Sequence, residues 1–213
     1  MTRPRDVFFY YPNIIGYIRV ICVVSSWYFA ETQWQISSLL YVLAFAGDAV
    51  DGLVARKFNQ TSRFGAVLDM VTDRASSAGL LMVLSRLYGS TEAFFFVLLM
   101  FIDLFSHWTH MESVSGHHKA ATSLSGRNFL IRAFYGLYPF FAFCCVGTEF
   151  FYVLLYLLHF VPGASLGALG LDLSLHSVCF FVCLPACICK QAVNVAQFCS
   201  AAFSLAEEDA HKP

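Results

Sequence analysis

Long apolar segments separated by short polar connections extend over almost the whole chain. Six of these segments are near or above the length that crosses the hydrocarbon core of a bilayer, which takes about 20 helical residues at a rise of about 1.5 Å each. The pattern therefore predicts an all-α, polytopic integral membrane protein. Its six transmembrane helices are expected at residues 14–30, 36–55, 64–87, 93–111, 129–161 and 173–205.

Prolines and polar residues modify this pattern in the second half of the chain. The segment 129–161 is interrupted by Pro139 and Gly147. Its second half alone would be too short to span a bilayer, so we expect one long or kinked helix. The last helix is expected to kink near Pro185, and residues 112–132 are expected to form the longest loop, of the kind that carries function when held over a site.

The composition supports the membrane assignment. The 213 residues are 58% hydrophobic and 13% charged, whereas soluble domains carry about 25% charged residues. The 13 basic residues are scattered rather than clustered, which argues against a nucleic-acid partner. We find no repeat and no polar stretch long enough for a soluble domain, so residues 1–213 are expected to form a single membrane domain.

Basic residues are distributed unequally between the two sides of the predicted membrane region. One side receives Arg86 alone, and the other receives Arg3, Arg5, Arg56, Lys57, Arg63, Lys119, Arg127, Arg132 and Lys212. The positive-inside rule places the richer side, with both termini, in the cytosol. Arg19 and Lys190 fall inside apolar segments, and we interpret both as side chains that reach the membrane interface by snorkelling.

Four aspartates interrupt the second and third apolar segments. Asp48 and Asp51 are three residues apart and share one helix face, as do Asp69 and Asp73, which are four apart. Gln60 marks the middle of the polar connection, and the nearer aspartate of each pair lies nine residues from it. In an antiparallel helical hairpin, the two pairs would lie at nearly the same depth on facing helices.

Such an arrangement predicts a metal site between the second and third helices. Carboxylates that converge in one place repel one another, so cations are expected between them. Ionisable groups at membrane depth usually mark functional sites. The set offers only hard oxygen ligands, without Cys or His, and this favours Mg²⁺ or Mn²⁺ over zinc, with two ions expected.

The residues around these aspartates also resemble a known family. From Asp48 to Asp73 the chain follows D-x-x-D-G-x-x-A-R, then eight residues, then G-x-x-x-D-x-x-x-D. This pattern is similar to the signature of the CDP-alcohol phosphotransferase family, and every fixed position is filled. The resemblance implies an enzyme that cleaves a CDP-activated substrate, releases CMP and joins a phosphoryl group to an alcohol.

The same resemblance implies roles for individual residues. The metal ligands would be Asp48, Asp51, Asp69 and Asp73, with Asp73 also the catalytic general base. CDP-diacylglycerol would be bound by Asn13, Gly52, Arg56 and Ser62. Asn13 belongs to a stretch similar to the family's nucleotide-binding P-N-x-x-T-x-x-R. This chain has Gly16 where the family has Thr.

Over about nine tenths of its length, the chain resembles the eukaryotic branch of the family that uses inositol. The likeness includes Y-P-N-I-I-G-Y-I-R and D-L-F-S-H-W-T-H-M. It implies transfer of a phosphatidyl group from CDP-diacylglycerol to myo-inositol, in the endoplasmic reticulum membrane, by a homodimer. Our hypothesis for the inositol pocket is a polar set made of Asn59, Gln60, His107, Lys119 and Arg132. Alternatively, Lys119 and Arg132 only hold their loop at anionic headgroups.

Three other functions are compatible with parts of the pattern. A relative that uses glycerol phosphate or serine would share the signature, although a phosphorylated acceptor should require more basic groups beside the site than this chain offers. A divalent-cation transporter would need polar residues through the full depth of the membrane, whereas the segments here are apolar beyond the aspartates. A catalytically inactive scaffold is disfavoured because the signature is intact.

Overall fold

The computed structural model describes residues 3–116, 129–165 and 174–210. In these ranges the chain forms helices and their connections, with one isolated antiparallel bridge between Ser165 and Ser174. The predicted all-α class is confirmed for this part of the chain. The chain divides into two compact units, residues 1–87 and 88–213, and each is described below by itself.

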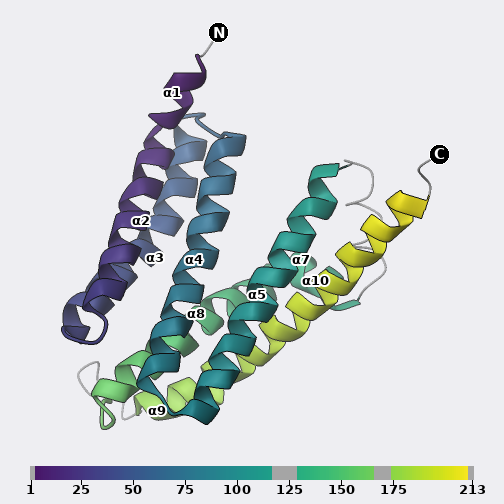
Figure 1. Cartoon of the computed structure of the whole chain (residues 1–213). Coiled ribbons are helices and arrows are strands. Elements are labelled where there is room, and N and C mark those ends of the chain that lie inside the picture. Colours follow the sequence, from purple (N-terminus) through teal and green to yellow (C-terminus); the bar gives the residue numbers. More distant parts are fainter. Residues whose placement is uncertain (1–2, 117–128, 166–173, 211–213) are drawn as a thin grey trace. The chain divides into compact units, whose positions relative to one another are not determined.

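Three long helices make up the N-terminal unit. They follow a short first helix, and the four elements are α1 (Pro4–Phe8), α2 (Tyr11–Phe29), α3 (Trp34–Lys57) and α4 (Arg63–Leu87). α2 packs along both α3 and α4, and the chain reverses direction at each connection (Figure 1). At the end where α2 and α4 finish, Arg86 Nε lies 2.9 Å from Glu31 Oε1 in an exposed ion pair.

Local sequence explains how the connection between α3 and α4 folds. Asn59 adopts a left-handed conformation with φ of 53°, and the amides of Asn59 and Gln60 donate to the carbonyls of Arg56 and Ala55. This is a Schellman motif, in which a left-handed residue closes a helix and satisfies its last carbonyl groups. On the other side, Ser62 Oγ accepts from the Gly65 amide at 3.0 Å and caps α4.

Glycines allow the helices of this unit to approach one another closely. Trp27 of α2 lies directly on Gly79 of α4, where any Cβ atom would overlap the indole ring. Gly16 of α2 leaves room for Leu68 of α4, whose Cδ2 would lie 2.8 Å from an added Cβ. The Gly16 that replaces the family's Thr is therefore a packing position between α2 and α4 in this chain.

The C-terminal unit is built around the last helix of the chain. Its elements are α5 (Ser90–Gly116), α7 (Phe129–Gly136), α8 (Tyr138–Phe160), α9 (Leu175–Val178), the π-helical turn η2 (Cys179–Cys183) and α10 (Leu184–Ala210). α10 packs against α5, α7 and α8. In this unit Gly147 of α8 lies against Ala186 of α10, so the glycine serves helix packing and does not end α8.

Buried polar side chains connect α5 to α10. Asn194 Nδ2 donates to Asp103 Oδ1 at 3.0 Å, and Lys190 Nζ donates to Asn194 Oδ1 at 2.5 Å. Lys190 Nζ also lies 4.0 Å from Asp103 Oδ1, and the lysine is only 5% exposed. The prediction that Lys190 snorkels to the interface is therefore wrong, because the side chain is held inside the unit by these partners.

The structure corrects three predicted elements of the second half. The segment 129–161 is not one helix: it breaks at Leu137, whose extended backbone allows Pro139 to start α8 in its first turn. The loop predicted at 112–132 is shorter, since α5 continues to Gly116 and α7 begins at Phe129, with 117–128 outside the described residues. Just before Pro185, where a kink was expected, the π-helical turn Cys179–Cys183 interrupts the α-helical hydrogen-bond pattern.

Among the described residues, four helical stretches are long and apolar enough to cross a membrane. They are Trp34–Lys57, Ser90–Val114, Tyr138–Phe160 and Leu175–Ala210. Large apolar side chains are exposed on these helices, such as Leu39, Phe101 and Phe181, as expected for surfaces that face lipid. These four helices agree with the membrane assignment, whereas two of the six predicted spans, at α2 and α4, lack this support.

The Gly79 contact generates a test of the N-terminal unit. We predict that Gly79→Leu destabilises the protein by about 1–3 kcal/mol, because a rigid indole ring occupies the space that the new side chain needs. Unfolding of the purified protein by sodium dodecyl sulfate in micelles measures the change. Gly136→Ala is the control, since a Cβ at Gly136 meets nothing within 4 Å. Equal stability of Gly79→Leu and the parent protein would contradict the described packing of α2 on α4.

Candidate functional site

Four aspartates from two helices meet at one guanidinium group. Arg19 Nη1 lies 2.6 Å from an Asp51 oxygen and 2.7 Å from an Asp69 oxygen. Its Nη2 lies 2.8 Å from Asp48 Oδ1 and 2.5 Å from Asp73 Oδ1. The predicted convergence of the two acid pairs at one depth is thus observed, and α2 supplies the group that joins them. We call these four aspartates the acid quartet.

The helices around Arg19 fix its position. Its Nε donates to the Ala44 carbonyl oxygen at 3.2 Å, and its methylene groups pass over Gly47, where an added Cβ would lie 2.8 Å from Arg19 Cγ. The residue is 4% exposed. The interpretation of Arg19 as a snorkelling side chain is therefore wrong: it extends sideways into the bundle and binds the acids.

The negative charge of the acid quartet indicates that it binds further cations besides Arg19. Asp48, Asp51 and Asp69 each offer one carboxylate oxygen within 4.8 Å of the others. At about 5 Å and an effective dielectric constant of about 20, each pair of like charges costs about 3 kcal/mol. Four ionised carboxylates and the Arg19 guanidinium sum to a net charge of −3, and Arg74, whose charge also acts on Asp73, reduces it to −2; divalent cations would neutralise the remainder.

The chemistry of the donors fits Mg²⁺ or Mn²⁺. Three acids converge closely enough to bind one ion, and all of the donors are carboxylate oxygens from rigid helices. Asp73 lies one helical turn beyond Asp69 and reaches the same guanidinium. The side chains of Asp48, Asp69 and Asp73 are between 32% and 45% exposed, so the acid quartet is accessible from one side.

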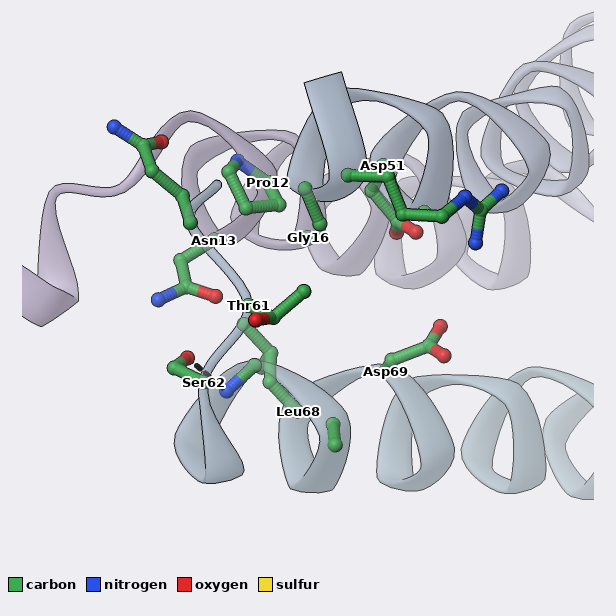
Figure 2. Close-up of a pocket in the computed structure, with 14 residues that line it drawn as sticks. Pro12, Asn13, Gly16, Asp51, Thr61, Ser62, Leu68 and Asp69 are labelled. Atoms are coloured by element: carbon green, nitrogen blue, oxygen red, sulfur yellow. Dashed lines mark hydrogen bonds between the residues drawn. The ribbon is translucent and has the colours of Figure 1, made fainter. Parts of the chain in front are cut away.

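A cavity of about 230 Å³ adjoins the acid quartet within the N-terminal unit. Fourteen residues from α2, α3, α4 and the connection before α4 line it, and Asp51 and Asp69 are among them. In Figure 2, Asp51 and Asp69 lie toward one end of the cavity, and Asn13 and Ser62 lie toward the other. A ligand that fills this space would therefore contact amide and hydroxyl groups at one end and carboxylates, or cations bound to them, at the other.

Asn13 presents a buried acceptor to this cavity. Its Nδ2 donates to the Val7 carbonyl oxygen at 2.6 Å, and this bond fixes the orientation of the amide, because a carbonyl oxygen can only accept. Its Oδ1 is buried and has no hydrogen-bond partner among the described residues, while Asn13 as a whole is 1% exposed. An unsatisfied buried acceptor costs about 1–3 kcal/mol, and a ligand donor would remove this cost.

Two glycines of the signature keep the cavity open. A Cβ at Gly65 would lie 2.7 Å from Asn13 Oδ1 and 3.1 Å from Ser62 Oγ. A Cβ at Gly52 would lie 3.7 Å from a guanidinium nitrogen of Arg56, so the arginine extends back along α3 over the glycine. All four residues expected to bind CDP-diacylglycerol, Asn13, Gly52, Arg56 and Ser62, line this one cavity.

The residues of the hypothetical inositol pocket are divided between the two units, so this pocket stays a prediction. Gln60 lines the cavity, and its Oε1 accepts from the Tyr11 amide at 2.9 Å. Asn59 is exposed in the Schellman motif and is not part of the lining. His107 and Arg132 belong to the C-terminal unit, where His107 Nδ1 lies 3.6 Å from Asp103 Oδ1 and Arg132 is exposed. Lys119 lies outside the described residues.

The sequence interpretation missed the role of Arg19 and part of the cavity lining. Thr61 and Leu68 line the cavity beside the expected residues. The position of Arg19 inside an apolar segment could have indicated this role, because a charge inside an apolar helix usually pairs with another charge at the same depth. The spacing from Pro12 gave the position of Arg19 along the helix. No local sequence pattern showed that this face of α2 turns toward the aspartates.

Comparisons with known proteins agree with the geometry. A family model described as CDP-alcohol phosphatidyltransferase matches residues 9–206. The CDP-diacylglycerol–inositol 3-phosphatidyltransferases of Homo sapiens and Schizosaccharomyces pombe are 39% and 36% identical to the chain, over 97% of it and 95% and 93% of their own lengths. That of Drosophila melanogaster is 37% identical over 96% of the chain and 88% of its own length. No solved structure matches. With an intact acid quartet and a family match over almost its full length, the chain belongs to the CDP-alcohol phosphatidyltransferase family.

Proposed function

We propose that this protein transfers the phosphatidyl group of CDP-diacylglycerol to myo-inositol, which gives phosphatidylinositol and CMP. The observation that carries the proposal is one cavity whose wall combines amide and hydroxyl side chains at one end with two members of the acid quartet at the other. The choice of inositol as acceptor is supported by the relatives, which are named as inositol 3-phosphatidyltransferases and align over nearly the full chain.

The reaction exchanges one bond at phosphorus for another. A hydroxyl oxygen of inositol bonds to the phosphorus that carries diacylglycerol, and the bond from that phosphorus to the CMP oxygen breaks. The hydroxyl proton passes to Asp73, the general base. Asp48, Asp51, Asp69 and Asp73 would hold divalent cations here, and bound cations neutralise the diphosphate and the departing phosphate.

The chain's own residues would orient the activated lipid. Asn13 Oδ1 would accept from a donor of the nucleotide, and Ser62 Oγ lies beside it at the same end of the cavity. The Arg56 guanidinium, which lies over Gly52, would pair with a phosphate of the CDP group. Rigid placement of the nucleotide by these groups would hold the reacting phosphorus beside the acid quartet.

The cavity would open at the cytosolic interface of the membrane. Exposed aromatic residues surround the α3–α4 connection, where Phe8 stacks edge-on against Phe64 and Tyr11 against Phe58. Arg56, Lys57 and Arg63 lie at the same end. Tyrosine prefers the bilayer interface and basic residues prefer the cytosolic side. This position would let lipid tails stay in hydrocarbon while the diphosphate reaches the acids.

Several finer features belong to the same proposal. We infer that α2 and α4 complete a set of six spans, that both termini are cytosolic and that the membrane is that of the endoplasmic reticulum. The family match extends across both compact units, which supports one catalytic domain. The homodimer stays a prediction from resemblance, and the contacts of inositol with Asn59, Gln60, His107, Lys119 and Arg132 stay our hypothesis.

An acceptor panel tests the proposed reaction directly. Purified protein is incubated with CDP-diacylglycerol, Mn²⁺ and, in separate reactions, labelled myo-inositol, glycerol 3-phosphate or serine. We expect CMP and labelled lipid with inositol alone. A labelled lipid from another alcohol would favour a different acceptor, and Mn²⁺ uptake into proteoliposomes without CMP release would favour a transporter.

Replacement of one member of the acid quartet tests the site. We predict that Asp69→Asn lowers CMP release by more than about 100-fold, the upper range for a group that only supports a metal ligand. The amide keeps the size of the side chain but removes its charge. Glu31→Gln is the matched control, because Glu31 is an acid of the same unit that pairs with Arg86 outside the cavity. Undiminished activity of Asp69→Asn would refute the assignment.

The cavity wall generates a separate prediction. We expect Gly65→Ala to raise KM for CDP-diacylglycerol by about 2–10-fold, the equivalent of one hydrogen bond, because the new methyl group would press on Asn13 Oδ1 and Ser62 Oγ. KM for inositol should change little. Gly163→Ala serves as the control, since a Cβ there meets nothing within 4 Å. A KM that rises for inositol alone would place the acceptor, not the nucleotide, at this end.

A further inference from the structure

We propose that Arg19 is a positioning residue that exchanges with divalent cations at the acid quartet. Before cations bind, Arg19 would hold the aspartates of α3 and α4 together. As cations bind, Arg19 would release carboxylate oxygens to the cations. This inference rests on the proposed metal site and extends it to a residue of α2.

The contacts of Arg19 support the first part of this role. Its two terminal nitrogens each contact one acid of α3 and one of α4, so the guanidinium is the direct link between the two pairs. Without a cation at this point, the four carboxylates would repel one another and force α3 and α4 apart. The stem of Arg19 is buried, and its Nε is bound to Ala44, which keeps the guanidinium at this depth.

Arg19 and a metal ion would compete for carboxylates of the acid quartet. The arginine contacts oxygens of Asp51 and Asp69, two of the three acids that converge closely enough to hold one ion. A guanidinium nitrogen at 2.6–2.7 Å from these oxygens already neutralises part of the negative charge that would attract a metal ion, and it occupies one side of each oxygen. Two cationic species that stabilise the same carboxylates weaken each other's binding, and this coupling is reciprocal.

Mn²⁺ binding to the full-length protein in detergent tests the exchange. Free Mn²⁺ is measured by its electron paramagnetic resonance signal during a titration of metal-free protein. We predict that Arg19→Gln lowers the Kd for Mn²⁺ by at least about fivefold, the low end of typical coupling between two sites. The metal-free variant should also melt at a lower temperature, and saturating Mn²⁺ should raise its Tm by more than it raises that of the parent protein.

Two further variants keep the test decisive if Arg19→Gln does not fold without metal. Gly47→Ala leaves Arg19 and all four acids in the chain, but its Cβ would lie 2.8 Å from Arg19 Cγ and displace the arginine. We expect it to tighten Mn²⁺ binding in the same direction. Arg86→Gln removes an arginine of the same unit that binds an exposed glutamate, and should leave the Kd unchanged.

The outcomes separate this inference from the proposed metal site. If the parent protein binds Mn²⁺ and both Arg19→Gln and Gly47→Ala bind it with equal or lower affinity, Arg19 does not compete with metal and the inference is wrong. If the parent protein binds no Mn²⁺, the metal site itself is wrong and the inference fails with it. Tighter binding in both variants, with Arg86→Gln unchanged, supports the exchange.

Discussion

The electrostatic balance between Arg19 and four aspartates is the constraint on which the N-terminal unit depends. Two ionised acids on each of two helices repel one another within hydrogen-bond reach of one point, so positive charge must lie there. Arg19 supplies part of that charge from a third helix. Small residues make the geometry possible, because Gly47 admits the arginine stem and Gly79 admits Trp27. The acid quartet with Arg19 and the close packing of the three helices therefore depend on each other.

The same arrangement connects the acids to the adjoining cavity. Asp51 and Asp69 belong both to the acid quartet and to the cavity wall, and Asn13 lies toward the other end of the same cavity (Figure 2). Gly65 and Gly52 add no side chain of their own to this cavity. The exposed aromatic rings at the α3–α4 connection would keep this end at the membrane surface, where a lipid with a polar activated headgroup can present its phosphates.

The sequence predicted those features that depend on short, periodic patterns. The i, i+3 and i, i+4 spacing of the aspartates, with Gln60 midway, was enough to place two acid pairs at one depth, and hydropathy was enough to predict an all-α membrane fold. Contacts between distant helices were less accessible. Arg19 and Lys190 were both interpreted as snorkelling because their partners, the acid quartet and Asp103, lie tens of residues away. The break at Leu137 was missed because the length argument for a span outweighed the helix-starting preference of Pro139.

The most direct measurement is a crystal structure of the protein with Mn²⁺, in which anomalous scattering locates the ions. Our account predicts anomalous density at about 2.0–2.6 Å from carboxylate oxygens of both α3 and α4, with the Arg19 guanidinium moved away from at least some of those oxygens. Density bound by the acids of one helix alone, or ions located elsewhere while Arg19 still bridges all four aspartates, would contradict it.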